Sequence, residues 1–353
     1  MSDPSASSAR GDARGDARGD ARTRALPRAH LHLHLEHAMR RATLAELAAR
    51  EGVALDGFFT FANLSEFLGR GAVLTGCIAR PEDLARVCRE LVEDEARDGV
   101  LYVEPMVLFH RWSPRLGSLD ELYALIWDAL RAAGAATGVE VGMMLGFGRH
   151  RDAPAEAEVL ARFAAAHAGA GIVAFGFGGD EARVGPERFA VACAIARAAG
   201  LLIVPHAGED AGPASVRAAL DVLHPNRIAH GVRAVEDAVV LARLAGEGIP
   251  CDVCPTSNVL LGVASSLAEH PVAAMLRAGV PVTLNADDPL EFGTTCAEEY
   301  RRVRDTFRLT DEQLARIAAT SATASGASAG TKRRIHTGIA RWLHESSPKE
   351  TTP

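Results

Sequence analysis

Eight short apolar runs recur along this chain, and a longer amphipathic stretch separates most of them from the next. Buried parallel strands have continuous apolar sequences of this kind, and the helices that connect them are amphipathic. Eight strand–helix repeats predict an α/β fold, specifically a (β/α)8 TIM barrel, which takes about 250 residues as one domain. A doubly wound parallel sheet is the alternative. The candidate strands are residues 29–35, 100–107, 139–147, 171–177, 201–206, 227–230, 249–254 and 280–286.

The two ends of the chain lack this pattern. Residues 1–24 contain the sequence GDAR three times in tandem and have no apolar periodicity. Such a charged, Gly-rich segment cannot bury enough surface to offset its ordering entropy, so we expect a disordered tail. We also expect residues 346–353 to be a frayed C-terminus. Residues 25–345 are then the single barrel domain.

Charge and cysteine usage exclude several classes of protein. The net charge is −7 and no basic stripe is present, which argues against a nucleic-acid partner and favours a small soluble substrate. The N-terminus has no apolar signal region, and no apolar run approaches the length of a membrane span. Six scattered cysteines do not form a disulfide pattern. We therefore expect a cytoplasmic protein without membrane contact; the oligomeric state is not fixed by the sequence.

A pair of histidines ends the first candidate strand. His32 and His34 are two residues apart, so both side chains point to the same face of a strand, which is the interior face in a barrel. Two imidazoles there supply half of a transition-metal site. Alone, the pair is weak evidence, because a strand with polar outward histidines has the same pattern. His30 continues the alternation and competes as a ligand.

Polar residues also end three later strands. His206 follows the apolar run LLIV and precedes Glu209, His230 lies in RIAHGV, and Asp287 and Asp288 lie in NADDP. Each alone has an ordinary structural explanation, as a hydrogen-bonded core histidine or a helix-capping carboxylate. Together, the histidines and an aspartate on strands 1, 5 and 8 predict a mononuclear zinc hydrolase. Strand 4 carries no lysine to bridge a second metal.

Five motifs occur in order between Leu26 and Trp342: LPRAHLHLHLE, HAGED, RIAHG, CPTSNVLLG and NADDPL. In this combination they resemble the adenosine deaminase family of metal-dependent hydrolase barrels. The resemblance implies one zinc ion (Zn2+) per chain, with a catalytic water completing its coordination. The implied protein ligands are His32, His34, His206 and Asp287.

The resemblance also implies the reaction, in which zinc-bound hydroxide attacks C6 of a 6-aminopurine nucleoside and converts adenosine to inosine and ammonia. Glu209 would protonate ring nitrogen N1, and this role requires a raised pKa. His230 would accept and orient the water proton, and Asp287 would steer the same water. The implied substrate contacts are Glu36 at the ribose 5′-hydroxyl, Gly179 at N3 and Asp288 at N7.

Apolar residues at helical spacing follow the first strand, where the family carries an apolar lid. Ordinary core packing explains the same spacing equally well. The residues are Phe58, Phe61, Leu64, Phe67 and Leu68.

The sequence departs from the family beside the ribose position. After HLHL the family usually has an acidic residue and then Gly, whereas here Glu36 is followed by His37, whose ring would intrude on the ribose side. Three other stretches resemble the branch of the family that deaminates 6-aminodeoxyfutalosine in menaquinone synthesis: AMRRATLAELA, SPRLGSL and GIVAFGF. That branch lacks an acidic residue at the position of Glu36. Arg40 or Arg149 is a candidate to meet an anionic 5′-substituent, although an ordinary surface position is the commoner explanation for such arginines. Adenine is a further alternative substrate.

Two other interpretations of the sequence remain: a zinc site formed by a different motif, and a barrel that binds its ligand without catalysing a reaction. The HxE of His34–Glu36 and the PCxxC of Pro250–Cys254 match elements of other zinc deaminases. They lie far apart in the sequence and on predicted strands, so we expect Cys251 and Cys254 to pack in strand 7. A catalytically silent barrel that binds zinc or purine is the non-enzymatic alternative, and turnover distinguishes it from an enzyme.

Overall fold

The computed structural model describes residues 21–61 and 63–345. In these residues the strands follow the eight predicted runs, and two of the runs are interrupted. β2 (Val100–Val103) continues as β3 (Met106–Val107), and β4 (Glu140–Val141) continues as β5 (Met143–Gly148). The remaining strands are β1 (Arg28–His30), β6 (Ile172–Gly178), β7 (Leu202–Ala207), β8 (Ile228–His230), β9 (Cys251–Val253) and β10 (Val282–Leu284).

The strands pair in parallel and close into a barrel. One sheet runs β10-β9-β8-β7-β6-β5-β3, and β1, β2 and β4 form the other. The segment after β1 joins the two edges of the larger sheet, because Leu33 bridges to Asp287 and His34 bridges to Met106. The side chain of Asn285 accepts further bonds from the backbone of residues 31 and 32, at 2.8 and 3.1 Å. The predicted (β/α)8 barrel is therefore confirmed.

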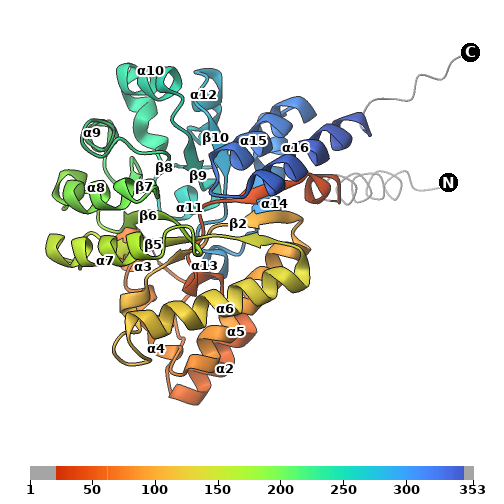
Figure 1. Cartoon of the computed structure of the whole chain (residues 1–353). Coiled ribbons are helices and arrows are strands. Elements are labelled where there is room, and N and C mark those ends of the chain that lie inside the picture. The colour runs from red at the N-terminus through yellow and green to blue at the C-terminus, as the bar shows by residue number, and fades with distance from the viewer. Residues whose placement is uncertain (1–20, 62, 346–353) are drawn as a thin grey trace, which may run out of the picture.

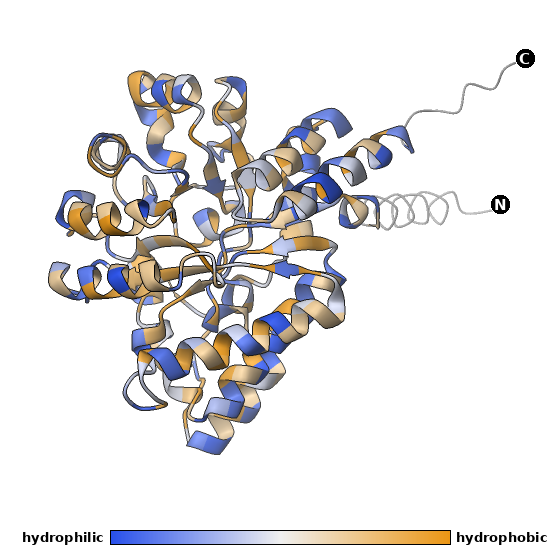
Figure 2. Cartoon of the chain, in the orientation of Figure 1, coloured by the Kyte–Doolittle hydropathy of each residue, from blue (hydrophilic) through white to orange (hydrophobic). Residues whose placement is uncertain are grey.

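Helices surround the strands, as Figure 1 shows. α6 (Leu119–Thr137) illustrates how the sequence sets their limits: Ser118 accepts a hydrogen bond from the Glu121 backbone at its start, and Gly138 ends it with a φ of +79°. In Figure 2 many hydrophobic residues lie on the helix sides that face the strands. The other helices used below are α2 (Arg41–Glu51), α3 (Leu64–Phe67), α4 (Arg70–Cys77), α5 (Pro81–Arg97), α7 (Pro154–Ala166), α11 (Pro255–Leu260) and α13 (Pro289–Phe292).

The remaining helices complete the outer layer and the C-terminal part of the fold. They are α8 (Ala190–Ala198), α9 (Pro213–Ala218), α10 (Ala238–Glu247), α12 (Val272–Arg277), α14 (Cys296–Phe307), α15 (Asp311–Ala324) and α16 (Ala329–His344). No helix in the described ranges is both long enough and apolar enough to cross a membrane.

The packed region begins before the predicted boundary at residue 25. Residues 21–25 are helical. Arg22 pairs with Asp311 at 2.6 Å, and its backbone oxygen accepts a bond from Trp342 at 2.9 Å. Thr23 is buried. Residues 1–20, with most of the GDAR repeat, and residues 346–353 lie outside the described residues.

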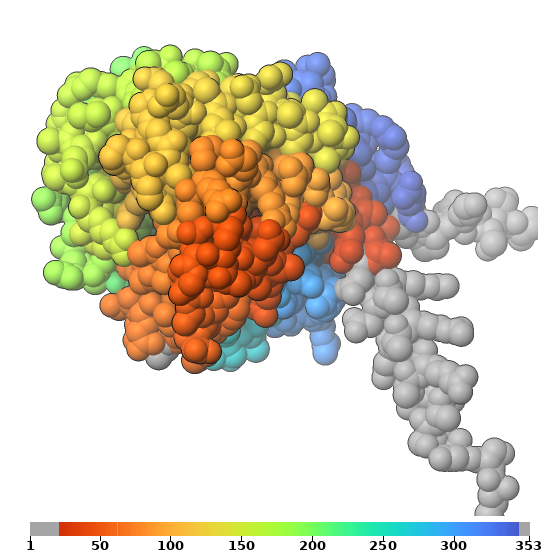
Figure 3. Space-filling view, turned by 90° about the horizontal axis from the view of Figure 1, so that it is seen from below, coloured from red at the N-terminus to blue at the C-terminus, as the bar shows by residue number. Residues whose placement is uncertain are grey.

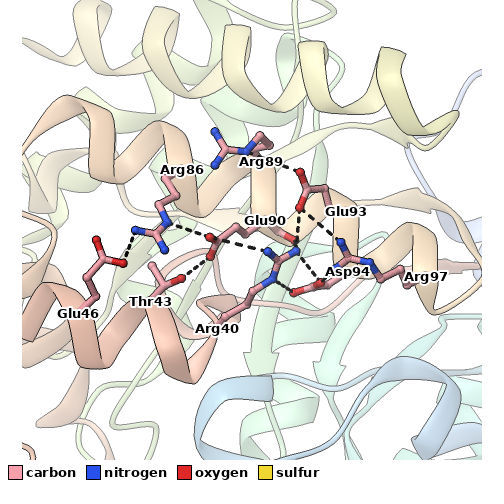
Figure 4. Close-up of polar contacts among 9 residues, drawn as sticks. All are labelled: Arg40, Thr43, Glu46, Arg86, Arg89, Glu90, Glu93, Asp94 and Arg97. Atoms are coloured by element: carbon pink, nitrogen blue, oxygen red, sulfur yellow. Dashed lines mark hydrogen bonds and ion pairs between the residues drawn. The ribbon is translucent and has the colours of Figure 1, made fainter.

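The segment between β1 and β2 contains α2 to α5, and its red-to-orange residues lie in the lower middle of the face seen in Figure 3. An ion-pair network attaches its start to α5 (Figure 4). Arg40 donates to Glu93 and Asp94, with nitrogen–oxygen distances of 2.8 Å. Its guanidinium is thus occupied outside the barrel mouth. Arg40 is therefore an ordinary paired arginine outside the pocket, and it is not placed to meet an anionic substituent there.

Candidate active site

A pocket lies at the carboxyl ends of the strands, and the predicted site residues other than His32 line it. We name the two sides of the pocket after the residue type that distinguishes each. The histidine side is formed by the ends of β1, β7, β8 and β10. The arginine side is formed by the ends of β3 and β5. The predicted residues in the lining are His34, Glu36, Gly179, His206, Glu209, His230, Asp287 and Asp288.

The four predicted metal ligands converge on the histidine side. Nitrogen atoms of His32, His34 and His206 lie within 4.8 Å of one another. Asp287 Oδ1 is 3.1 Å from His32 Nε2 and 3.3 Å from His34 Nε2. His32 Nε2 is buried without a hydrogen-bond partner. Three imidazoles and a carboxylate around such an orphaned atom fit a transition-metal ion, and zinc in particular.

The electrostatics favour the metal-binding protonation states of His206 and Asp287, whereas Asp287 raises the pKa of His32 against the effect of burial. Burial, together with the neighbouring histidines, holds the pKa of His206 well below its usual range. Burial opposes ionisation of Asp287, yet His32 and His34 keep the pKa of that carboxyl well below its usual range. A neutral imidazole and an ionised carboxylate are the forms that ligate metal.

Two of the site residues have left-handed backbone conformations. His230 has a φ of +65° and Asp287 has a φ of +63°, although neither is glycine. Such conformations are uncommon for residues with a side chain and concentrate at functional sites. Backbone bonds hold Asp287 in place, since its N–H donates to His32 and its oxygen accepts from His34, both at 3.1 Å. This holds its carboxylate beside both imidazoles.

Glu209 lies beside the metal cluster on a loop that Glu181 organises. The carboxylate of Glu181 accepts bonds from four consecutive backbone N–H groups, residues 208–211, and those of Glu209, Asp210 and Ala211 are 3.0 Å long. Glu209 is 5% exposed, and burial together with Asp287 and Glu181 raises its pKa well above the usual range. The carboxyl is therefore held protonated and available as a proton donor.

A chain of hydrogen bonds fixes the ring of His230. Val272 N–H donates to His270 Nδ1 at 3.1 Å, so His270 carries its proton on Nε2 and donates to Asn258 Oδ1, also at 3.1 Å. Asn258 Nδ2 must then donate to His230 Nδ1, at 3.2 Å. Burial lowers the pKa of His230 to about 3, so the ring is neutral.

Neutral His230 consequently presents an Nε2–H to the site, 3.6 Å from Glu209 Oε1 and 3.8 Å from Asp287 Oδ2. We predicted from the sequence that His230 accepts a proton. The hydrogen-bond chain makes it a donor instead. The sequence analysis missed Asn258 and His270, although the motif CPTSNVLLG contains Asn258.

The predicted substrate contacts share the pocket with a charged cluster around His37. His37 Nδ1 is 2.8 Å from Glu291 Oε1 and 3.5 Å from Asp288 Oδ1. Although burial opposes it, the charge of Glu291, whose oxygen is 2.8 Å away, is the main cause that raises the pKa of His37 to about 10. Burial and the neighbouring carboxylates raise the pKa of Asp288 well above its usual range. Glu36 is buried, and its Oε2 has no hydrogen-bond partner.

The five apolar residues at helical spacing after the first strand divide between the core and the pocket lining. Phe58 belongs to the main hydrophobic core. Leu64 and Phe67 form a separate apolar cluster with Leu261 and Phe292, and Phe61 and Leu68 pack against it. Phe67 stacks on Phe292 with ring centroids 5.1 Å apart. Leu64, Phe67 and Leu68 line the pocket, as does Gly179, where a Cβ would collide with the His150 ring.

Three other sequence alternatives are resolved by the structure. His30 is not a free ligand, because its Nδ1 donates to Glu95 at 2.9 Å and its Nε2 accepts from the Ala286 backbone at 3.0 Å. Cys251 and Cys254 are buried thiols outside the described candidate metal clusters. Arg149 is 2% exposed, lies outside the pocket lining and donates to the His206 backbone oxygen, so it is not placed to meet a substrate anion.

None of the residues of the arginine side was predicted from the sequence as part of the site. Arg111 ends the short helix η2 (Phe109–Arg111) after β3, and His150 and Arg151 follow β5. All three residues line the pocket, together with Leu108. No motif marks them. The chain has 38 basic residues, so an arginine by itself carries little information.

Comparison with known proteins gives the same family for nearly the whole chain. The model of the adenosine deaminase family matches residues 27–342. A putative adenosine/adenine deaminase of Streptomyces virginiae is 40% identical over 323 residues, which cover 87% of this chain and 93% of the relative. An aminodeoxyfutalosine deaminase of Streptomyces coelicolor is 37% identical over 319 residues, covering 85% and 81%.

A solved structure shares the fold. The crystal structure of an amidohydrolase from Burkholderia ambifaria, with bound zinc, superposes with a TM-score of 0.82 at 27% identity and covers 92% of this chain and 93% of that one. The barrel, the convergent histidines and these similarities agree. This chain belongs to the adenosine deaminase family and is a hydrolase of C–N bonds.

Proposed function

We propose that this protein removes the 6-amino group of a 6-aminopurine nucleoside, adenosine or a close relative, by zinc-dependent hydrolysis. The observation that carries the proposal is the placement of Glu209, a buried carboxyl with a raised pKa, beside the histidine–aspartate cluster in one pocket. His32, His34, His206 and Asp287 would hold one zinc ion. When bound, zinc lowers the pKa of a water molecule from 15.7 to about 7 and so supplies a nucleophile at neutral pH.

The side chains of the pocket complete the chemistry. Glu209 donates its proton to purine N1, which makes C6 electrophilic. His230 donates its Nε2–H to the attacking oxygen and orients it, while the Asp287 carboxylate accepts a proton from that oxygen. Addition of water at C6 and departure of ammonia then give the 6-oxopurine.

The purine contacts follow from the same protonation states. Asp288, held protonated, donates a hydrogen bond to N7, which is an acceptor. The Gly179 N–H meets N3, and Glu36 meets the ribose 5′-hydroxyl. The apolar cluster around Phe67 covers the pocket and excludes water, which strengthens these polar interactions.

Two substrates with the same chemistry are alternatives. The names of the Streptomyces relatives support adenine and aminodeoxyfutalosine alongside adenosine. His37 in the pocket favours a substrate other than unmodified adenosine, because it occupies space that the family usually leaves to glycine. A catalytically silent barrel is disfavoured because both Glu209 and His230 are present. Six free cysteines are consistent with a cytoplasmic location.

A turnover assay tests the proposal. Zinc-loaded protein is mixed with adenosine, adenine or adenosine carrying a 5′-substituent, and conversion to the 6-oxopurine is followed by ultraviolet absorbance with parallel detection of ammonia. We expect turnover that a chelator abolishes and zinc restores. Absence of turnover on every 6-aminopurine, with zinc bound stoichiometrically, would contradict the proposal.

A further inference from the structure

The arginine side of the pocket has cationic groups that the proposed chemistry does not use. Arg111 and Arg151 follow β3 and β5, which are neighbours in the sheet through the pair Met106 and Met144. Both guanidinium groups therefore lie on the same side of the pocket. A neutral purine and ribose have no group that needs two guanidinium partners.

Arg111 is half-buried and has no counter-ion in the described ranges. Its Nε is buried without a hydrogen-bond partner, and no carboxylate lies within ion-pair distance of its guanidinium. The nearby carboxylate of Asp152 is already bonded to the Gly148 N–H at 2.7 Å and to His110 Nε2 at 3.1 Å. A buried guanidinium with an unused donor is costly unless a ligand completes it.

Glycine makes room for this arrangement. A Cβ on Gly148 would lie 2.8 Å from an Arg111 terminal nitrogen, so the bare backbone lets the guanidinium lie against the end of β5. Arg151 is exposed, and it donates to His150 Nε2 at 3.1 Å and to the Leu68 oxygen at 3.3 Å. These two contacts hold Arg151 against the apolar cover of the pocket.

His150 does not add a competing charge. Burial and the two arginines lower its pKa, so its ring is neutral between them. The carboxylates near this side are Asp152 and Asp180, and Asp180 accepts a bond from the Arg183 backbone at 3.1 Å. The histidine side, by contrast, gathers Glu36, Asp287 and Asp288. An anion in the pocket is attracted to the arginine side, where no carboxylate of the described residues forms an ion pair with Arg111.

We propose that Arg111 and Arg151 form an anion subsite, and that the substrate is a 6-aminopurine nucleoside whose 5′ end carries a carboxylate or phosphate group. This inference rests on the proposed function and narrows its substrate class. Arg111 supplies planar, paired N–H donors suited to either anion, and Arg151 adds charge at the mouth. Arg40 and Arg149 have no part in the subsite, because both are occupied elsewhere.

The test compares anionic with neutral substrates of similar size. Zinc-loaded full-length protein is assayed with AMP, with adenosine 5′-carboxylate and with neutral 5′-methylthioadenosine, and kcat/KM is measured for each. We expect at least one anionic substrate to exceed the neutral one about tenfold or more, because hydrogen bonds to charged groups are the strongest in proteins. AMP and the carboxylate identify which anion is preferred. A wild-type preference for 5′-methylthioadenosine over both would overturn the subsite.

Variants assign the preference to the two arginines. Arg111→Gln and Arg151→Gln should each lower the anionic-to-neutral ratio of kcat/KM, Arg111→Gln by about tenfold or more and Arg151→Gln by less because it is exposed. Arg162→Gln, on the outer helix α7, is the matched control and should leave the ratio unchanged. Equal losses on anionic and neutral substrates would overturn the proposal, since they would indicate a structural role.

A binding measurement separates the subsite from the proposed function. Affinities of IMP and inosine are measured by calorimetry for the wild type and for Arg111→Gln. If IMP binds more tightly than inosine and Arg111→Gln removes the difference, a phosphate subsite is supported even if no 6-aminopurine is deaminated. If neutral adenosine is turned over and neither measurement shows an anion preference, the proposed function stands and the subsite is overturned.

Discussion

The proton-transfer groups of the histidine side and the arginines of the other side differ in how the protein supports them. On the histidine side the proton-transfer groups have supporting partners: Glu181 bonds four backbone groups of the loop that carries Glu209, and Asn258 bonds His230. On the arginine side, Arg111 keeps an unused buried donor and Arg151 is exposed. Groups that do chemistry must be preorganised by the protein, whereas groups that select a substrate can be completed by the substrate itself.

The same contrast predicts what each side does when it is altered. Changes on the histidine side should reduce the rate for every substrate, because they affect atoms at the reacting centre. Changes on the arginine side should alter the ratio between substrates. Variants of Glu209, His32 and Asn258 test the expected loss of rate on all substrates. The Arg111 and Arg151 variants test the expected change in the ratio between substrates.

The largest effect is expected from Glu209→Gln. Glutamine has similar size but cannot give a proton to N1, so kcat should fall about 10²–10⁴-fold for all substrates alike. Steady-state kinetics and elemental analysis of the same preparation measure rate and zinc content together, and zinc should stay near one per chain. Asp210→Asn, at the adjacent carboxylate, is the control and should retain activity. Near-normal turnover of Glu209→Gln would remove it from the mechanism.

His32→Ala should remove zinc rather than only slow the reaction. His32 is buried with its Nε2 unpartnered, so its loss takes one nitrogen from the centre of the ligand cluster. We expect zinc content well below one ion per chain and activity that falls with it for all substrates. His344→Ala, at an exposed histidine, is the control. Full occupancy in His32→Ala would show that the ion is held elsewhere in the cluster.

The histidine side was largely predictable from sequence because its signals are local. Alternation along the first apolar run brought His32 and His34 together in the prediction, although β1 itself ends at His30, and Glu209 follows His206 within one motif. The apolar runs gave the strands for the same reason. The interruptions at Glu104–Pro105 and Gly142 were not predicted, because a short break within an apolar run leaves its pattern intact.

The arginine side and the supporting partners depend on contacts between distant segments. Arg40, Arg111 and Arg149 are the same residue type. Only the fold shows that Arg40 is paired outside the pocket, that Arg149 is buried on the His206 backbone oxygen, and that Arg111 has no ion pair with a described carboxylate. Likewise, the role of Glu291 depends on α13 meeting His37 across the barrel mouth. No local pattern encodes such meetings.

A smaller effect is expected from Asn258, which positions His230 without reaching the substrate. Asn258→Ala removes the donor to His230 Nδ1, and losses of such supporting bonds typically cost about 10–100-fold. Asn258→Asp is more informative, because a carboxylate accepts at Nδ1 and reverses the tautomer. Nuclear magnetic resonance of labelled histidine should show the proton on Nε2 in the wild type and on Nδ1 in Asn258→Asp. An unchanged tautomer and an unchanged kcat would show that His230 is held by other contacts.

The smallest effect is expected at His37, and it concerns how the free energy of unfolding depends on pH. The pKa of His37 in the folded protein is about 10, above the value near 6.5 in the unfolded chain. The contribution of the protonated ring to stability is therefore complete below about pH 6.5 and is lost as the pH rises toward 10. Resonances of labelled histidine, assigned with His37→Gln, should show the ring still protonated at pH 8. The free energy of unfolding should fall between pH 6.5 and 9.5 in the wild type. A ring that titrates near 6.5 would mean that Glu291 does not hold it charged, and His37 would then resemble His150, a neutral ring in the wall of the pocket.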